Sequence, residues 1–255
     1  MPIRVSVISY LNTVPFVYGL LNHPIARDIE LHYATPSKAA QDILEGKSDI
    51  GIIPSAVIPS IGKDNIVSDY CIGAEGDVAS VLLCSNVPLQ DIELVYLDAD
   101  SRTSVVLSRI LFRKYWKLDP FYTPFDFSTQ VIDPVNSYIL IGDKALNYHD
   151  RFRYVYDLAG EWVKFTNLPF VFACWTSARK MDDYFIKGFN DALKFGISNM
   201  ERAVKEVKHG FDQKYALDYL TGNISFNLGP DKRKGLSEFW SLALEELKSK
   251  VRWFG

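Results

Sequence analysis

Residues 3–54 read IRVSVISYLNTVPFVYGLLNHPIARDIELHYATPSKAAQDILEGKSDIGIIP, in which strand signals alternate with helix signals. Ile3–Ile8, Ile29–Ala34 and Asp49–Pro54 are β-branched or apolar runs of the kind that form buried strands. Between them lie two amphipathic segments, each with a proline near its start, where the first turn of a helix tolerates one. Strand, helix, strand, helix and strand at this spacing predict a parallel sheet with right-handed crossovers.

The rest of the chain predicts a second α/β unit inserted into the first. Ala79–Ser85 is an apolar strand, and the following Asn86-Val87-Pro88 offers a crossing point between lobes. After Trp175 the composition favours helices alone. We expect an α/β clamshell with mixed, mostly parallel sheets and helices on both faces. Its first lobe comprises residues 1–86 plus 175–255, and its second comprises 87–174. In such folds a ligand binds between the lobes, at the carboxyl ends of strands.

Composition excludes several classes of protein. The 255 residues contain 28 Lys+Arg and 31 Asp+Glu, a net charge of −3, which argues against a nucleic-acid partner. No apolar stretch reaches the ~20 residues of a membrane span, and the N-terminus has no signal-peptide pattern. The cysteines, Cys71, Cys84 and Cys174, are odd in number, form no CxxC pair and sit in apolar runs. They predict buried core thiols in a reducing compartment, so we expect a cytoplasmic protein without a membrane partner.

The usual catalytic motifs are absent from the sequence. GxGxxG, GxxxxGK[ST], GxSxG and HExxH do not occur, and the four histidines share no metal-ligand spacing with cysteine or carboxylate residues. We therefore predict no metal site, and no motif indicates a nucleotide or a catalytic triad.

Hydroxyl and amide side chains recur where strands are followed by helices. The residues concerned are Ser9, Asn12, Thr13, Ser55, Ser80, Thr103 and Ser104. Helix N-termini carry unpaired N–H groups and partial positive charge, which suit carboxylates and phosphates. Each of these residues, taken singly, also fits a plain helix N-cap. Together they favour a small anionic ligand held mostly by uncharged donors, with Arg102 as the charged exception.

The opening segment Ser9–Phe16, SYLNTVPF, resembles the first motif of the chorismate dehydratase family. The resemblance continues through Pro54-Ser55, 78–81 (VASV), 101–104 (SRTS), 141–146 (IGDKAL), 157–162 (DLAGEW) and 166–175 (TNLPFVFACW). Two departures, both expected in a loop, are Ala159, which is inserted before the glycine, and Asn167, which replaces the usual glycine.

The resemblance implies a type II periplasmic-binding-protein-like fold used as a cytoplasmic enzyme. The implied reaction is dehydration of chorismate to 3-[(1-carboxyvinyl)oxy]benzoate in menaquinone biosynthesis, by the futalosine route and without a cofactor. It places Asn12 and Ser80 near the reacting ring. The other expected substrate contacts are Ser9, Tyr10, Thr13, Ser55, Arg102, Thr103, Ser104, Gly142 and Asp143.

The sequence alone leaves three points undecided: the base, the function and the oligomeric state. The base that removes the proton is either Asp143, which follows a strand, or the substrate's own enolpyruvyl carboxylate, which the resemblance favours. Two other functions compete: a non-enzymatic protein that binds a small carboxylate in the same fold, and the sister enzyme 1,4-dihydroxy-6-naphthoate synthase. The sister enzyme typically opens Pro-Asn-Asp and uses a histidine base, whereas this chain has Leu11-Asn12-Thr13. Both a monomer and a homodimer fit the sequence.

Overall fold

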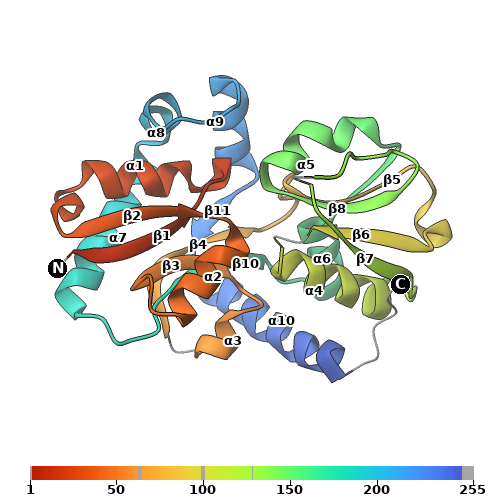
Figure 1. Ribbon diagram of the computed structural model, residues 1–255, viewed down its shortest axis with the longest axis horizontal. Helices are drawn as coiled ribbons and strands as arrows, with labels where there is room; N and C mark the ends of the chain where they lie inside the picture. The colour runs from red at the N-terminus through yellow and green to blue at the C-terminus, as the bar shows by residue number, and fades with distance from the viewer. Residues whose placement is uncertain (1, 63–64, 99–100, 128, 249–255) are drawn as a thin grey trace. The chain divides into compact units, whose positions relative to one another are not determined.

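The computed structural model describes residues 2–62, 65–98, 101–127 and 129–248 (Figure 1). The chain divides into two compact units, each with its own sheet. Unit 1 is built from residues 1–73 and 171–230, and unit 2 from residues 74–170 and 231–255.

Unit 1 contains a six-stranded sheet in the order β11-β4-β10-β3-β1-β2. Its strands are β1 (Ile3–Ile8), β2 (Ile29–Ala34), β3 (Ile50–Pro54), β4 (Ile66–Ala74), β10 (Phe170–Thr176) and β11 (Ser225–Asn227). Its helices are α1 (Val14–Asn22), α2 (Pro36–Leu44), α3 (Ile58–Ile61), α7 (Asp183–Ser198), α8 (Met200–Glu206) and α9 (Gln213–Gly222), with the 3₁₀ turns η1 (Leu11–Thr13) and η2 (Pro24–Arg27). β1 pairs in parallel with both β2 and β3, so the parallel unit predicted from residues 3–54 is confirmed.

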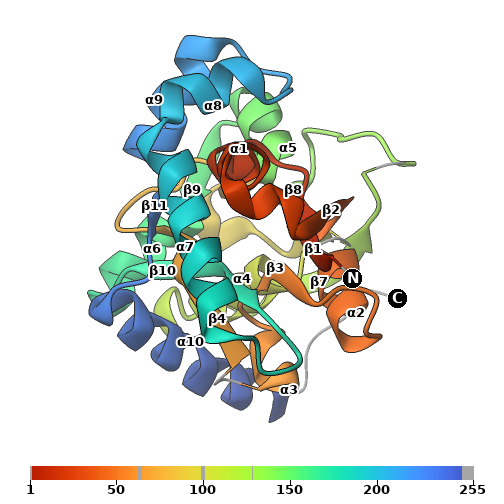
Figure 2. The ribbon, with the colours of Figure 1, turned by 90° about the vertical axis from the view of Figure 1, so that its left-hand side faces the viewer.

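Helices cover both faces of the unit 1 sheet. A Cβ on Gly51 of β3 would lie 3.2 Å from the Ile43 side chain, which places α2 on that face. Trp175 of β10 pairs with Ile52, the neighbour of Gly51, and therefore points to the opposite face. There its ring meets Phe16 of α1 at 5.6 Å and Phe189 of α7 at 5.1 Å. Figure 2 shows α1 and α7 on this side of the unit.

Two glycines set the approach of α1 and α7. A Cβ on Gly196 of α7 would come within 1.8 Å of the Pro15 carbonyl oxygen, and one on Gly19 within 2.1 Å of the Ala192 carbonyl oxygen. The helix backbones touch at this crossing, since no side chain separates them. Because α1 begins directly after η1, the crossing also fixes the position of the turn that follows β1.

A charged cluster forms around Asp49, the residue before β3 in unit 1. Its carboxylate accepts hydrogen bonds from the backbone N–H and guanidinium of Arg4 and from the guanidinium of Arg179, at 3.0–3.3 Å. Burial by itself would raise the pKa of Asp49, but these hydrogen bonds outweigh it and lower the pKa to about 2.

Asp49→Asn should therefore lower the free energy of unfolding at pH 7, by on the order of 2 kcal/mol. The folded-state pKa lies below the ordinary value of 3.8, so the stabilisation is present above pH 3.8 and is lost as the pH falls toward 2. Urea denaturation at pH 7 and pH 3 checks this, because the difference between wild type and variant should shrink at the lower pH. An equal difference at both pH values would contradict the assignment.

Unit 2 contains a five-stranded sheet in the order β7-β6-β8-β5-β9. Its strands are β5 (Val81–Ser85), β6 (Leu94–Asp98), β7 (Phe121–Phe125), β8 (Ser137–Ile141) and β9 (Tyr154–Asp157). Its helices are α4 (Thr103–Ile110), α5 (Gly142–Tyr148), α6 (Leu158–Thr166) and α10 (Pro230–Lys248), with a π-helical turn (Leu111–Tyr115) that extends α4. β6 is parallel to β7 and β8, whereas β5 is antiparallel to β8 and β9, so this sheet is mixed.

The unit 2 core has an aliphatic and aromatic layer on each side of the sheet. Leu82, Tyr138 and Leu140 form one cluster with Ala145 of α5, while α4 and α6 lie on the other side (Figure 1). Phe239 of α10 packs edge-on against Trp162 of α6 and Phe170, with ring centroids 6.2 and 5.1 Å apart.

The division of the chain differs from the one expected from sequence. β5 pairs with β8 and β9, so residues 81–85, which the sequence placed in the first lobe, belong to unit 2. Residues 86–88 therefore lie between two strands of one sheet and do not cross between lobes. The aromatic contacts of Phe239 place the C-terminal helix in unit 2 as well. The expectation of helices alone after Trp175 was wrong, because β11 adds a three-residue strand beside β4.

The expected burial of the cysteines agrees with the structure. All three are buried and none forms a disulfide, and burial raises the pKa of Cys84 to about 12, so this thiol stays protonated. None of the helices in the described part of the chain combines the length and the apolar character needed to cross a membrane.

Candidate functional site

In unit 1, the expected site residues gather at one edge of the sheet. β1 and β3 are parallel neighbours, so their carboxyl ends meet there. Ser9, Tyr10 and Asn12 follow β1, and Ser55 follows β3. The register pairs Ser6 with Gly51, and continuing it brings Ser9 level with Pro54.

These four residues differ in exposure and in how they are held. Ser9 is exposed, Tyr10 and Asn12 are half-buried, and Ser55 is fully buried. The Ser55 backbone N–H donates to the Phe172 carbonyl at 2.9 Å, which fixes the turn after β3 against the start of β10. Asn12 lies in η1 with its neighbours buried on both sides, so the turn holds its backbone in one place.

Thr13 has a structural role in the same turn. Its hydroxyl lies 2.5 Å from the Ile8 carbonyl oxygen and 2.8 Å from that of Tyr10, so its proton is donated within the turn. Thr13 stands at the N-cap position of α1, yet its side chain does not cap the helix. The first N–H groups of α1 are thus left uncapped by this side chain.

In unit 2, the expected residues also meet at one edge of the sheet. Ser80 comes before β5, Gly142 and Asp143 follow β8, and Thr103 begins α4, the next helix after β6. β5 runs antiparallel to β8, with Val81 opposite Ile141, so the start of one strand adjoins the end of the other. A 2.7 Å hydrogen bond from the Gly142 N–H to the Ser80 carbonyl joins the two segments directly.

Three helices begin at this edge of unit 2, at Thr103, Gly142 and Leu158. Helix N-termini there present N–H groups and partial positive charge to the same region. Thr103 and Ser104 are buried in the first turn of α4, and the exposed Arg102 is its N-cap residue without a side-chain cap.

Asp143 lies half-buried in the first turn of α5, where the helix dipole favours a negative charge. Its neighbour Lys144 points to another carboxylate: the Lys144 ammonium forms a 2.6 Å ion pair with Asp98 and lies 4.5 Å from the centre of the Phe127 ring. Asp98, at the end of β6, is only 2% exposed.

Sequence reasoning missed three charged residues at this edge. Asp98 is the last residue of β6, and Lys144 follows β8 within the motif at 141–146, so either position could have revealed them. Asp157 lies in the motif at 157–162, but only the structure shows what its carboxylate contacts. It accepts hydrogen bonds from backbone N–H groups of two separate segments.

The two departures from the family motif have simple structural explanations. Ala159 is not in a loop but in the first turn of α6, fully buried, and its N–H donates to Asp157 at 3.0 Å. Asn167 ends α6 with a φ of 57°, a left-handed conformation that asparagine tolerates nearly as glycine does. Ala159 is thus accommodated in the capped first turn, and Asn167 supports the left-handed end of the helix.

The histidines take no part in either edge. Each has a polar contact with a group no more than five residues away in sequence: His23, His32, His149 and His209. Among the described side chains, no three His, Cys, Asp or Glu residues come together as metal ligands would.

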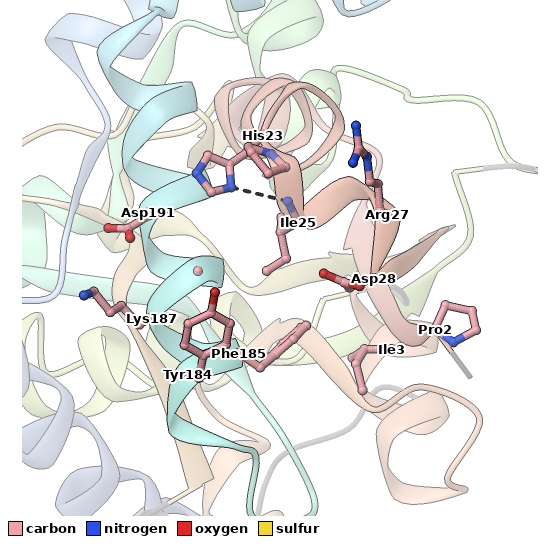
Figure 3. A pocket seen from close by; sticks show the side chains of 12 residues that line it. Pro2, Ile3, His23, Ile25, Arg27, Asp28, Tyr184, Phe185, Lys187 and Asp191 are labelled. Atoms are coloured by element: carbon pink, nitrogen blue, oxygen red, sulfur yellow. Dashed lines mark hydrogen bonds between the residues drawn. The ribbon is translucent and has the colours of Figure 1, made fainter.

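A separate hollow of about 890 Å³ lies elsewhere on unit 1 (Figure 3). His23 and Asp28 line it from the segment between α1 and β2, and Tyr184 and Lys187 line it from α7. It opens beside Ile3 at the start of β1, whereas Ser9 follows the other end of that strand, roughly 20 Å away for six residues. The hollow is therefore distinct from the edge that holds the motif residues.

Comparison with known proteins gives a matching family and named relatives. The profile of a family described as menaquinone biosynthesis matches residues 3–245. A chorismate dehydratase of Thermus thermophilus is 24% identical over 258 residues, covering 88% of this chain and 94% of the relative. A chorismate dehydratase of Campylobacter jejuni is 30% identical over 179 residues, covering 68% of this chain and 66% of the relative.

A solved structure gives the fold. The Candida albicans CA3427 gene product, described as having the generic periplasmic binding protein fold, superposes with a TM-score of 0.62 at 14% identity, over 100% of this chain and 98% of that one. The expected periplasmic-binding-protein-like α/β fold is thus confirmed.

Proposed function

Given that this chain belongs to the menaquinone biosynthesis family, we propose that it is a chorismate dehydratase, a lyase that removes water from chorismate to form 3-[(1-carboxyvinyl)oxy]benzoate. Two relatives of that name support the proposal. The observation that carries it is the placement of the motif residues. Segments far apart in sequence lie next to strand ends at a single edge of each sheet, where a fold of this type binds its ligand.

The reaction explains why uncharged donors suffice. The hydrogen on ring C3 is vinylogous to the C1 carboxylate, so removing this proton spreads negative charge onto that carboxylate. The C4–O bond then breaks, the hydroxyl leaves with a proton as water, and a C3=C4 double bond completes an aromatic ring. Aromatisation supplies the driving force, so the protein has to orient the substrate and stabilise the developing charge.

We assign these tasks to the two edges. Asn12 of unit 1 orients the substrate or assists the departing hydroxyl, and Ser80 of unit 2 hydrogen-bonds a substrate carboxylate. Ser55 binds a carboxylate through its hydroxyl, and Thr103 and Ser104 bind one through hydroxyl and N–H groups, in buried positions that strengthen such bonds. The remaining proposed contacts are those of Ser9, Tyr10, Arg102, Gly142 and Asp143, with Thr13 acting through the turn that it holds.

Asp143→Asn should retain substantial activity, within about tenfold of wild type. The reason is that the proposed base is the enolpyruvyl carboxylate of the substrate, so Asp143 need not accept the proton. Steady-state kinetics with chorismate across pH measures this. A loss on the order of 10³-fold or more would instead make Asp143 the general base.

The proposed function is tested by incubating the purified protein with chorismate and following the product by mass spectrometry. Loss of one water, with the ultraviolet spectrum of a substituted benzoate, is the expected result. Unchanged chorismate would refute the dehydratase. Binding of chorismate without turnover would favour a carboxylate-binding protein of the same fold.

We further propose that the protein works in the cytoplasm. The support for this location is its three buried cysteines, which form no disulfide and suit a reducing compartment.

A further inference from the structure

Residues 77–80, the segment that leads into β5, are held by three contacts within unit 2. The Ala79 N–H donates to Asp157 at 2.7 Å, and the Ser80 carbonyl accepts from Gly142 at 2.7 Å. A Cβ on Gly160 would come within 1.9 Å of the Asp77 carboxylate, so the Asp77 side chain packs directly on the first turn of α6. The turn before Ser80 is therefore fixed by the starts of two helices.

Ala79 has a backbone conformation that it would not adopt unaided. Its φ of 59° is left-handed, which costs an alanine roughly 1 kcal/mol or more. Such a conformation persists only where surrounding contacts impose it. Ala79 itself takes part in one such contact, because its N–H donates a hydrogen bond to Asp157.

Asp157 divides its two carboxylate oxygens between two segments. Oδ1 accepts the N–H groups of Ala159 and Gly160 at 3.0 and 3.1 Å, which caps α6. Oδ2 accepts the Ala79 N–H. One side chain thus ties the N-terminus of α6 to the residue that precedes Ser80. Capping alone would need only one oxygen, as in Asp212 of α9, whose Oδ1 accepts the Tyr215 N–H at 3.1 Å.

We propose that Asp157 is a positioning residue for Ser80: its second oxygen holds Ala79 in the left-handed conformation that sets where the Ser80 hydroxyl lies. This inference rests on the proposed dehydratase function, in which Ser80 contacts the substrate. A misplacement of about 1 Å at such a contact lowers rates up to 100-fold.

Asp157→Asn separates the two tasks of the carboxylate. Asparagine caps helices as well as aspartate does, so its single oxygen can keep the bonds to Ala159 and Gly160. Its NH₂ group then faces the Ala79 N–H, and a donor meets a donor. We expect kcat to fall by about 10-fold or more, with a smaller change in KM.

The decisive measurement combines this change with Ser80→Ala. If Asp157 acts through Ser80, Asp157→Asn should cost no more than about twofold in kcat once the Ser80 hydroxyl is gone. An equal loss in both backgrounds would overturn the proposal. The matched control is Asp212→Asn, the same substitution at a cap in unit 1, which should leave kcat unchanged.

A second readout does not depend on turnover. In NMR hydrogen exchange, the Ala79 amide should be protected in the wild type and should exchange faster in Asp157→Asn, while the Ala159 amide stays protected. If the wild-type protein does not dehydrate chorismate, the proposed function fails. The exchange data then still test whether Asp157 holds the Ala79 amide. Unchanged Ala79 protection would overturn the positioning role. Asp157→Ser, also a good cap but one atom shorter, serves in the same tests if Asp157→Asn folds poorly.

Discussion

Asn12→Ala and Ser80→Ala should each lower kcat for chorismate dehydration by about 100-fold. Removing a donor aimed at charge that develops in the transition state raises the barrier more than it weakens substrate binding. Asn12 lies in η1 at the unit 1 edge, and Ser80 is 1% exposed at the unit 2 edge. Stopped-flow or steady-state assays of product absorbance measure the effect.

Two variants of the same chemistry control for general damage. Ser108→Ala removes a buried serine hydroxyl that donates to the Val105 carbonyl inside α4, at 2.9 Å. Asn22→Ala removes an amide that donates to Tyr18 at the end of α1, at 3.0 Å. Both variants should stay within about twofold of wild-type kcat, since neither residue lies at the sheet edges that hold the proposed substrate contacts. Wild-type turnover in the Asn12 or Ser80 variant would contradict the proposed site.

Gly196→Ala should lower the free energy of unfolding by about 3 kcal/mol. The new methyl carbon would lie 1.8 Å from the Pro15 carbonyl oxygen and 2.8 Å from the Gly19 nitrogen. Both are backbone atoms, so no rotamer change can relieve the clash and α1 has to move away from α7. Thermal and urea denaturation measure the loss, and kcat should fall as well, because α1 follows the turn that holds Asn12.

Gly188→Ala, on the same helix, is the matched control. A Cβ there would lie 3.7 Å from the Ile25 side chain, an ordinary van der Waals contact. Replacing a glycine inside a helix by alanine should stabilise the protein by up to about 1 kcal/mol where space allows. Opposite effects from two identical substitutions would establish the close helix crossing. A Gly196→Ala protein as stable as wild type would disprove it.

Much of the fold was readable from local sequence. The alternation of residues 3–54 predicted β1, β2 and β3 as parallel strands, and the pairing of β1 with both neighbours confirms this. Each of these strands is a short apolar run, and the helix signals between them predicted the parallel crossovers. β4 escaped attention because its apolar residues are interrupted by Ser68 and Asp69, and because both of its neighbours in the sheet, β10 and β11, lie far away in the sequence.

The domain boundaries could not be read in this way. Residues 81–85 form an apolar strand by composition, but only the pairing of β5 with β8 and β9 shows the sheet to which they belong. Likewise, the amphipathic pattern of α10 predicts a buried face without indicating that Phe239 meets Trp162 and Phe170.

For the candidate site, the residue types came from sequence alone: hydroxyls and amides near strand ends, and family motifs that include Asn12 and Ser80. The expected place after a strand was wrong for Ser80, which precedes β5. Only the tertiary structure shows which contacts each of these residues makes. The Thr13 hydroxyl serves its own turn, and Asp157 joins Ala79 to α6 across 78 residues of sequence. The physical reason is that strand and helix propensities act over a few residues, whereas a hydrogen bond between distant segments exists only once the sheet has brought them together.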